Sequence, residues 1–276
     1  LAAQNHQKNN LKVAENLYKK ILKKDPNHAF THNNLGLVFQ AFGEFQKARS
    51  CYEKAIEIQP NYANAYNNLG LVLKELGERK KAISNYEKAI QLNSNQADMH
   101  NNLANAHREL GELQKAIGYY EKSIQINPNY ANAHYNLGAV FNELRENQKA
   151  INCYEKVIQI NPNYESAYNN LGVLFNELGK DQKAISYFQK AIEINPNYAS
   201  AHNNLGAIFM QLGKLQKAKG FFQKAIQIQP NYSEAYWNLH SLASNIDEAL
   251  TVLKKVYDFD KKFIKAKIMI SALQGF

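Results

Sequence analysis

The spacing of its prolines constrains the fold of this chain more than any other feature of its sequence. The six prolines are Pro26, Pro60, Pro128, Pro162, Pro196 and Pro230. Consecutive prolines lie 34 positions apart, except for the interval from Pro60 to Pro128, which is twice as long and has Ser94 at its midpoint. Because proline ends a helix, this period indicates a helical unit that stops at the same point each time. It predicts full units at residues 29–62, 63–96, 97–130, 131–164, 165–198 and 199–232, a partial unit at 1–28, a degenerate unit at 233–260, and a capping or truncated helix at 261–276.

Each full unit has the pattern of two amphipathic helices. Position 7 is leucine in every full unit, position 20 is alanine, and position 24 is tyrosine or phenylalanine. Position 8 is glycine in five units, although a glycine inside a helix costs about 1 kcal/mol relative to alanine. We therefore expect another helix to approach closely at position 8. Glycine at position 15 predicts a left-handed turn that ends the first helix. Arg145 replaces that glycine in one unit, where we expect a turn that is either strained or closed in a different way.

The apolar stripe of one unit can be buried only by its neighbours, so the pattern predicts an all-α solenoid of stacked units. Leucine at position 7, glycine or alanine at position 8, alanine at position 20 and proline at position 32 resemble the tetratricopeptide repeat (TPR), and the resemblance covers nearly the whole chain. It implies a right-handed superhelical solenoid of helix-turn-helix repeats of about 34 residues. It also implies that the first helices line the inner, concave surface.

A row of asparagines is the strongest functional signal on those first helices. Asparagine is a mediocre helix former, so local propensity does not explain the row. It occupies position 6 in all seven first helices, at Asn34, Asn68, Asn102, Asn136, Asn170, Asn204 and Asn238. It also occupies position 5 at Asn33, Asn67, Asn101, Asn169 and Asn203.

The asparagine row is similar to the asparagine ladder in the repeat domain of O-linked N-acetylglucosamine transferases. A carboxamide offers one acceptor and two donors, so such a row can bind the backbone of an extended peptide. The alternative is that the amides bond between neighbouring helices and only hold the repeats together.

A second row, at position 13, is acidic across the middle units, at Glu75, Glu109, Glu143 and Glu177. Chaperone-binding TPR domains use cations on this face to clamp a terminal carboxylate, but here those cations are missing at the matching positions, although Lys74 and Arg108 lie beside them. We therefore expect an extended partner segment that is neutral to basic, not a carboxylate-clamp ligand. The alternative is a solvated acidic face, or pairing with lysines of adjacent units.

Several function classes find no support in the sequence. The net charge of +9 arises largely from two lysine rows on the second helices, which solubility explains, and no arginine cluster or interleaved aromatic residues indicate nucleic acid. The histidines at position 4 alternate with tyrosine as packing residues, and no cluster has metal-ligand spacing. We find no phosphate loop, no nucleophile motif and no apolar run long enough for a membrane span. The sequence thus predicts neither an enzyme nor a cofactor, and two distant reduced cysteines suit the cytoplasm.

The sequence favours a scaffold that binds an extended polypeptide along the asparagine-lined surface. A first alternative is the substrate-targeting or regulatory arm of a larger transferase, since both ends of the chain read as cut from a longer protein. A second alternative is a self-assembling scaffold, because the apolar end segment could stack end to end. Its apolar residues are Phe263, Ile264, Ile268, Ile270, Leu273 and Phe276.

Overall fold

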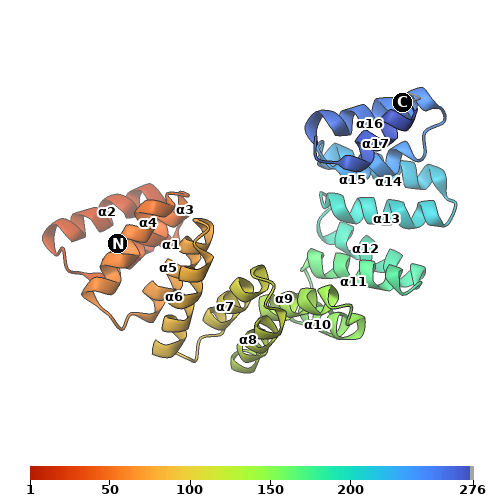
Figure 1. Ribbon diagram of the computed structural model, residues 1–276. Helices are drawn as coiled ribbons and strands as arrows, with labels where there is room; N and C mark the ends of the chain where they lie inside the picture. Colours follow the sequence, from red (N-terminus) through yellow and green to blue (C-terminus); the bar gives the residue numbers. More distant parts are fainter. Residues whose placement is uncertain (274–276) are drawn as a thin grey trace. The chain divides into compact units, whose positions relative to one another are not determined.

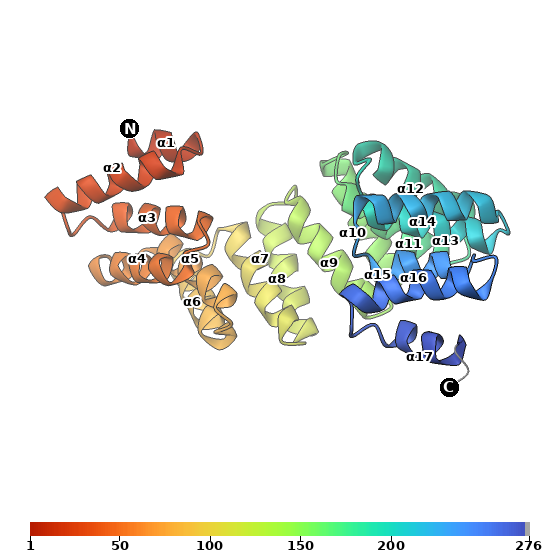
Figure 2. The same cartoon turned by 90° about the horizontal axis from the view of Figure 1, so that it is seen from above.

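The computed structural model describes residues 1–273, and every regular element in that stretch is an α-helix (Figures 1 and 2). The chain divides after Glu146 into two compact units, each built from antiparallel helix pairs. The apolar end segment predicted from the sequence is described only as far as Leu273, so Phe276 lies outside the described residues.

The first unit contains nine of the described helices. The pairs recur with a first helix of 13 residues and a second of 14 from α3 onward. The helices are α1 (Ala2–Gln7), α2 (Leu11–Lys24), α3 (Ala29–Ala41), α4 (Phe45–Ile58), α5 (Ala63–Glu75), α6 (Arg79–Leu92), α7 (Ala97–Glu109), α8 (Leu113–Ile126) and α9 (Ala131–Glu143).

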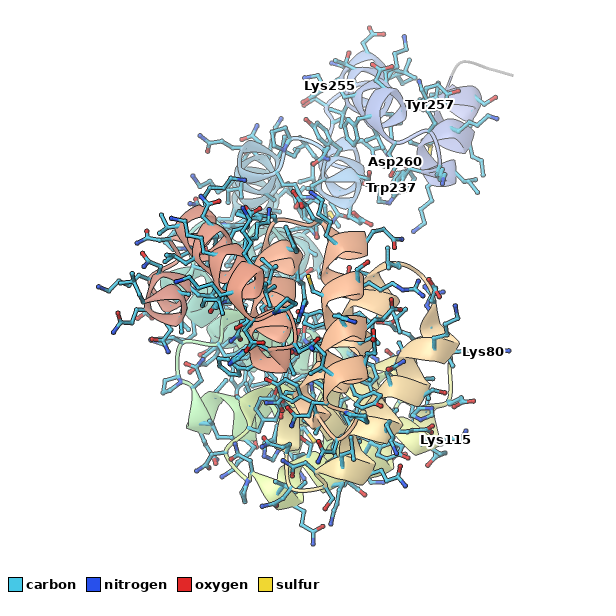
Figure 3. All side chains as sticks on the ribbon, turned by 90° about the vertical axis from the view of Figure 1, so that its left-hand side faces the viewer. Lys80, Lys115, Trp237, Lys255, Tyr257 and Asp260 are labelled. Atoms are coloured by element: carbon cyan, nitrogen blue, oxygen red, sulfur yellow. The ribbon has the colours of Figure 1, made fainter. Side chains whose placement is uncertain are left out.

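The second unit continues the same alternation and then shortens. Its helices are α10 (Asn147–Ile160), α11 (Glu165–Glu177), α12 (Asp181–Ile194), α13 (Ala199–Gln211), α14 (Leu215–Ile228), α15 (Ser233–His240), α16 (Ile246–Phe259) and α17 (Ile264–Leu273). A cluster of Leu253, Val256 and Ala266 joins α16 to α17, with Trp237 of α15 packed against it (Figure 3). Ile264 and Ile268 of α17 remain largely exposed.

The turn between the two helices of a repeat depends on left-handed backbone. The five glycines at position 15 have φ between 69° and 78°. Arg145 takes φ 61° at the same position, so the chain keeps the turn although the residue there has a Cβ. Of the two outcomes expected at Arg145, the structure has the left-handed turn with its backbone strain, not a turn that closes in a different way.

The close approach predicted at position 8 is also present. A Cβ built on Gly70 would lie 2.5 Å from the ring of Tyr86 at position 24 of the same repeat, and one on Gly172 would lie 2.6 Å from Phe188. Both rings are fully buried. Burying such a ring stabilises by about 1.5–3 kcal/mol, which exceeds the cost of about 1 kcal/mol for a mid-helix glycine.

The first helices of consecutive repeats lie next to one another within each unit. In the first unit α3 contacts α5, α5 contacts α7 and α7 contacts α9, while each intervening second helix packs against the first helices before and after it. In the second unit α11 contacts α13, and α13 contacts α15. Side chains at equal positions of successive first helices are therefore neighbours, which is the geometry that a ladder of amides requires.

Candidate functional site

The asparagines at positions 5 and 6 form hydrogen bonds between consecutive repeats. In each bond the Nδ2 of a position-6 asparagine donates to the Oδ1 of the position-5 asparagine in the preceding repeat. Within the first unit the pairs are Asn68 to Asn33 (3.0 Å), Asn102 to Asn67 (3.1 Å) and Asn136 to Asn101 (3.1 Å). Within the second unit they are Asn204 to Asn169 (3.0 Å) and Asn238 to Asn203 (2.9 Å).

The two positions of the ladder differ in burial. The position-5 asparagines are buried, with 4–7% of their surface exposed, whereas most position-6 asparagines are half-buried. Asn34, in the first full repeat, is buried at 9%. Asn170 is half-buried, and its Oδ1 lies 3.5 Å from the Nδ2 of Asn169. The inter-repeat bonding that the sequence left as an alternative is thus a real feature of both units.

The inter-repeat bonds leave part of each position-6 amide unused. One N–H of each amide in the five pairs goes to the neighbouring repeat, and the Oδ1 and the second N–H remain. Among the described residues, the fully buried polar atoms without a partner include none from positions 5 or 6. The unpartnered Oδ1 atoms of these amides are therefore not fully buried.

The acidic row at position 13 is largely compensated in the first unit. Glu75 lies 3.5 Å from the Nζ of Lys74, and Glu109 lies 3.8 Å from the same amine and 3.6 Å from Arg79. Glu143 of α9 pairs with Arg108 of α7. The pairs of Glu109 and Glu143 link adjacent repeats, as the alternative interpretation of the row predicted, and their partial exposure limits each to about 0–1 kcal/mol.

Glu177, the acidic residue of the row in the second unit, differs from the other three. It is exposed at the end of α11, and its carboxylate forms no ion pair with a described residue. The acidic character of the row is therefore strongest there.

A hollow of about 250 Å³ lies beside Glu109 and Glu143 of the acidic row in the first unit. Lys74 of α5, Asn105 and Arg108 of α7, and Glu143 of α9 line it. Tyr120 forms a hydrogen bond of 2.6 Å from its hydroxyl to the Oδ1 of Asn105, and burial raises its pKa to about 12, so the hydroxyl stays protonated and donates. Asn105 was not predicted as a site residue, because only one repeat has asparagine at position 9.

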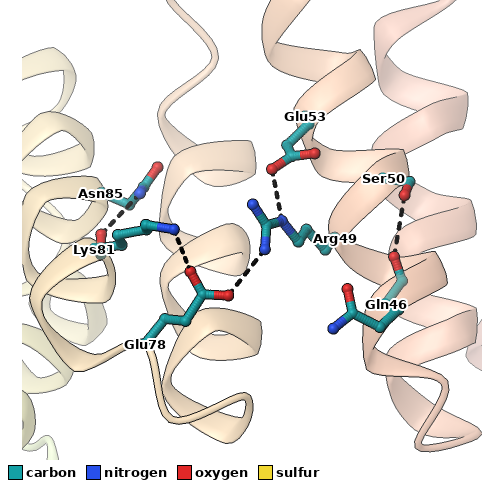
Figure 4. Close-up of polar contacts among 7 residues, drawn as sticks. All are labelled: Gln46, Arg49, Ser50, Glu53, Glu78, Lys81 and Asn85. Carbon is teal, nitrogen blue, oxygen red and sulfur yellow. Dashed lines mark hydrogen bonds and ion pairs between the residues drawn. The ribbon is translucent and has the colours of Figure 1, made fainter.

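The second helices present a different surface. Lys80 of α6 and Lys115 of α8 point away from the ribbon (Figure 3). Arg49 of α4 bridges Glu53 and Glu78 at 2.7 and 2.9 Å (Figure 4). The hydrogen bond from Lys81 and the charges of Lys81 and Arg49 lower the pKa of Glu78. This network joins two successive second helices, and Arg49, Glu53 and Lys81 also line a shallow hollow of about 310 Å³ beside it.

The position-4 histidines do more than pack. Each places Nε2 2.9–3.0 Å from the backbone carbonyl of the residue at position 32 of the preceding repeat. His32, His100, His134 and His202 therefore tie the start of a first helix to the turn before it. Within residues 1–273, no group of three His, Cys, Asp or Glu side chains is arranged to hold a metal ion.

The repeat pattern and the helix pairs place the chain in a known family. One family model described as tetratricopeptide repeat matches residues 28–95 and 95–163. A second model of the same description matches residues 166–198 and 199–232. The chain belongs to the tetratricopeptide repeat family. Such proteins are helical scaffolds that typically bind other proteins and are typically not catalytic.

Solved structures resemble the chain to different degrees. The crystal structure of MamA is 32% identical with a TM-score of 0.54, over 60% of this chain and 96% of MamA. YrrB, described as a TPR protein with an unusual peptide-binding site, is 23% identical with a TM-score of 0.54, over 72% of this chain and 98% of YrrB. The Cut9–Hcn1 hetero-tetramer of the APC/C is 21% identical with a TM-score of 0.72, over 88% of this chain and 48% of that one.

The YrrB and Cut9–Hcn1 structures have low sequence identity to this chain, so their similarity shows a shared fold alone.

A comparison with curated protein sequences finds no match. No helix in the described part of the chain has the length and apolar character needed to cross a membrane.

Proposed function

We propose that this protein binds an extended polypeptide segment against the face formed by its first helices. The observation that supports this most directly is the asparagine ladder, whose half-buried position-6 amides use one N–H for the inter-repeat bond and have further hydrogen-bonding capacity in successive repeats. A peptide backbone offers its own N–H and C=O groups to such amides whatever its side chains are. The peptide-binding site described for YrrB, which shares this fold, supports a segment as the partner.

The hollow at Lys74, Asn105, Arg108 and Glu143 offers room for one side chain of the bound segment. A basic side chain there would compete with Arg108 for the carboxylate of Glu143, and a neutral one would leave the ion pair intact. Glu177 adds an uncompensated charge in the second unit. These features favour a segment that is neutral to basic.

The expected affinity for the segment follows from the hydrogen bonds that the position-6 amides can form with its backbone. Each net hydrogen bond contributes about 0.5–1.5 kcal/mol, and ordering an extended segment offsets much of the sum. We expect dissociation constants near 1 μM, which correspond to about −8 kcal/mol.

The test separates the structural and binding roles of the ladder. In Asn102→Ala/Asn136→Ala, both the inter-repeat bonds and the position-6 amides are lost. The matched control Asn67→Ala/Asn101→Ala removes the buried acceptor of each of the same two bonds. The position-6 amides of Asn102 and Asn136 remain in this control. Partners are captured from a lysate with the wild-type protein and quantified by mass spectrometry for both variants.

The proposal expects that the position-6 variant loses captured segments that the position-5 variant retains, at equal helicity by circular dichroism. Equal capture by both variants would refute the role of the amides as a binding surface. It would leave them as connections between repeats.

A second candidate function is end-to-end self-association, which the exposed side chains of Ile264 (67%) and Ile268 (64%) on α17 favour. Such a contact between unlike surfaces builds open or ring-shaped assemblies. Multi-angle light scattering across a concentration series tests it. A monomer at every concentration, or a mass that Ile264→Lys/Ile268→Lys does not change, would speak against it.

A further inference from the structure

A groove of about 510 Å³ lies on the second unit, outside the asparagine face. Its apolar surface comes from Phe209 of α13 and Phe221 of α14, whose rings stack with centroids 5.5 Å apart. Gly220 lies beside them, and Gln189 of α12, His202 of α13, and Gln216, Lys217 and Lys224 of α14 complete the lining. Its volume falls within the range of about 300–1,000 Å³ that small-ligand sites occupy.

Gly220 is the first sign that this groove is more than a packing defect. A glycine inside a helix costs about 1 kcal/mol unless a neighbour needs the space. At Gly36, Gly70, Gly172 and Gly206 that neighbour is an aromatic ring, but a Cβ on Gly220 would meet no atom within 4 Å. Packing therefore does not require this glycine, and the absence of a side chain leaves the groove unfilled at that point.

The charge around the groove is the second sign. Position 25 is glutamate in the earlier second helices, at Glu53, Glu87, Glu121 and Glu155, and position 16 is glutamate at Glu44, Glu78, Glu112 and Glu146. In the last two full repeats position 25 becomes Gln189 and Gln223, and position 16 becomes Lys180 and Lys214. The carboxylates that positions 16 and 25 supply elsewhere are thus missing from these two repeats, although Lys190 pairs with Glu193 and Lys219 with Glu248.

The remaining lysines are concentrated over the apolar floor. The Nζ atoms of Lys214 and Lys217 lie 5.9 and 5.7 Å from the centroid of the Phe209 ring. Helix α14 has no acidic residue, and of its three lysines only Lys219 forms an ion pair, with Glu248, which leaves Lys217 and Lys224 without a carboxylate partner among the described residues. An apolar floor under uncompensated ammonium groups is complementary to an apolar side chain flanked by carboxylates.

We propose that the groove between α12, α13 and α14 docks an acidic protein segment that lays one large aromatic side chain against the stacked Phe209 and Phe221 rings beside Gly220. The flanking carboxylates of that segment bind Lys217 and Lys224. This site lies apart from the asparagine face and prefers the opposite charge, so one scaffold would hold two chemically distinct partners.

The experiment uses fluorescence anisotropy of a fluorescein-labelled pentapeptide with a central tryptophan and two glutamates on each side. Two further peptides replace the glutamates by glutamine or the tryptophan by alanine. The full chain is compared with Gly220→Gln, which fills the groove on an open helix surface, and with Gln189→Glu, which restores the acid of the earlier repeats. Gly118→Gln is the matched control, because Gly118 occupies the same helical position in the first unit, also with no atom within 4 Å of an added Cβ.

We expect the acidic tryptophan peptide to bind the wild type and Gly118→Gln equally. Its affinity should fall at least tenfold in Gly220→Gln and severalfold in Gln189→Glu, and it should decrease as salt rises. The proposal is overturned if this peptide does not bind the wild type at 1 mM, if Gly220→Gln binds it unchanged, or if either altered peptide binds as well. The Asn102→Ala/Asn136→Ala variant should retain it, and loss there with retention in Gly220→Gln would place the peptide on the first helices and overturn the proposal.

Discussion

Replacing Arg145 with glycine should stabilise this protein. Arg145 has φ 61°, in the left-handed region, at a turn position where five other repeats have glycine with φ 69–78°. Its side chain is exposed, and it forms no ion pair with a described residue. The substitution therefore removes a backbone strain without removing a contact.

The magnitude follows from the backbone. A left-handed residue with a Cβ costs about 1–2 kcal/mol, and the greater freedom of glycine in the unfolded chain offsets part of the gain. The net increase in the free energy of unfolding is about 1 kcal/mol. For a domain of this size that corresponds to a rise in Tm of about 2–4 °C.

Urea and thermal unfolding followed by circular dichroism at 222 nm measure the effect. The reverse substitution Gly77→Arg is the control, because a Cβ at Gly77 meets no atom within 4 Å and only the backbone is changed. It should destabilise by about the same amount that Arg145→Gly stabilises. If Arg145→Gly leaves the unfolding midpoint unchanged or lowers it, the turn is not strained and the reasoning is wrong.

Three further predictions concern the contacts between helices and repeats. Gly70→Ala should lower the free energy of unfolding by about 1–3 kcal/mol, measured by urea unfolding, because the new Cβ overlaps the buried ring of Tyr86. A double-mutant cycle of Asn67→Ala and Asn102→Ala should give a coupling energy of about 0.5–1.5 kcal/mol in the same assay, and a value near zero would show that the ladder bond adds no stability. Because its lysine and arginine partners lower the pKa of Glu78, this residue stabilises above the ordinary carboxyl range and the effect is lost as the pH falls through the lowered pKa. Wild type should therefore have a higher urea midpoint than Glu78→Gln at pH 7, and the two midpoints should converge once the pH falls below the lowered pKa of Glu78.

The asparagine row shows how far a sequence pattern can be interpreted. The recurrence of asparagine at position 6 indicated a function that local helix propensity could not supply, and both interpretations of the row followed from the chemistry of the amide. Only the structure shows that Asn102 donates to Asn67 of the preceding repeat. The partner is distant in the sequence, and the bond exists because stacking brings equal positions of neighbouring first helices together.

The acidic row illustrates the opposite case. Position 13 suggested a surface selective for basic segments, but Glu109 and Glu143 have cationic partners, and Arg108 lies on the preceding first helix. The residue type at one position of the repeat does not by itself give the net charge of the surface there. Long lysine and arginine side chains of the adjacent repeat can reach that position and neutralise a carboxylate. The preference for neutral to basic segments stays a proposal, with Glu177 as its least compensated residue.

The repeat period, the helix pairs and the left-handed glycine turns were determined by the sequence alone, because proline, glycine and apolar spacing act on the local backbone and on one helix face. The inter-repeat amide bonds, the ion pairs of the glutamates and the groove beside Gly220 were decided by the tertiary structure. Each depends on side chains from two or three helices that only the stacking of helices brings into contact.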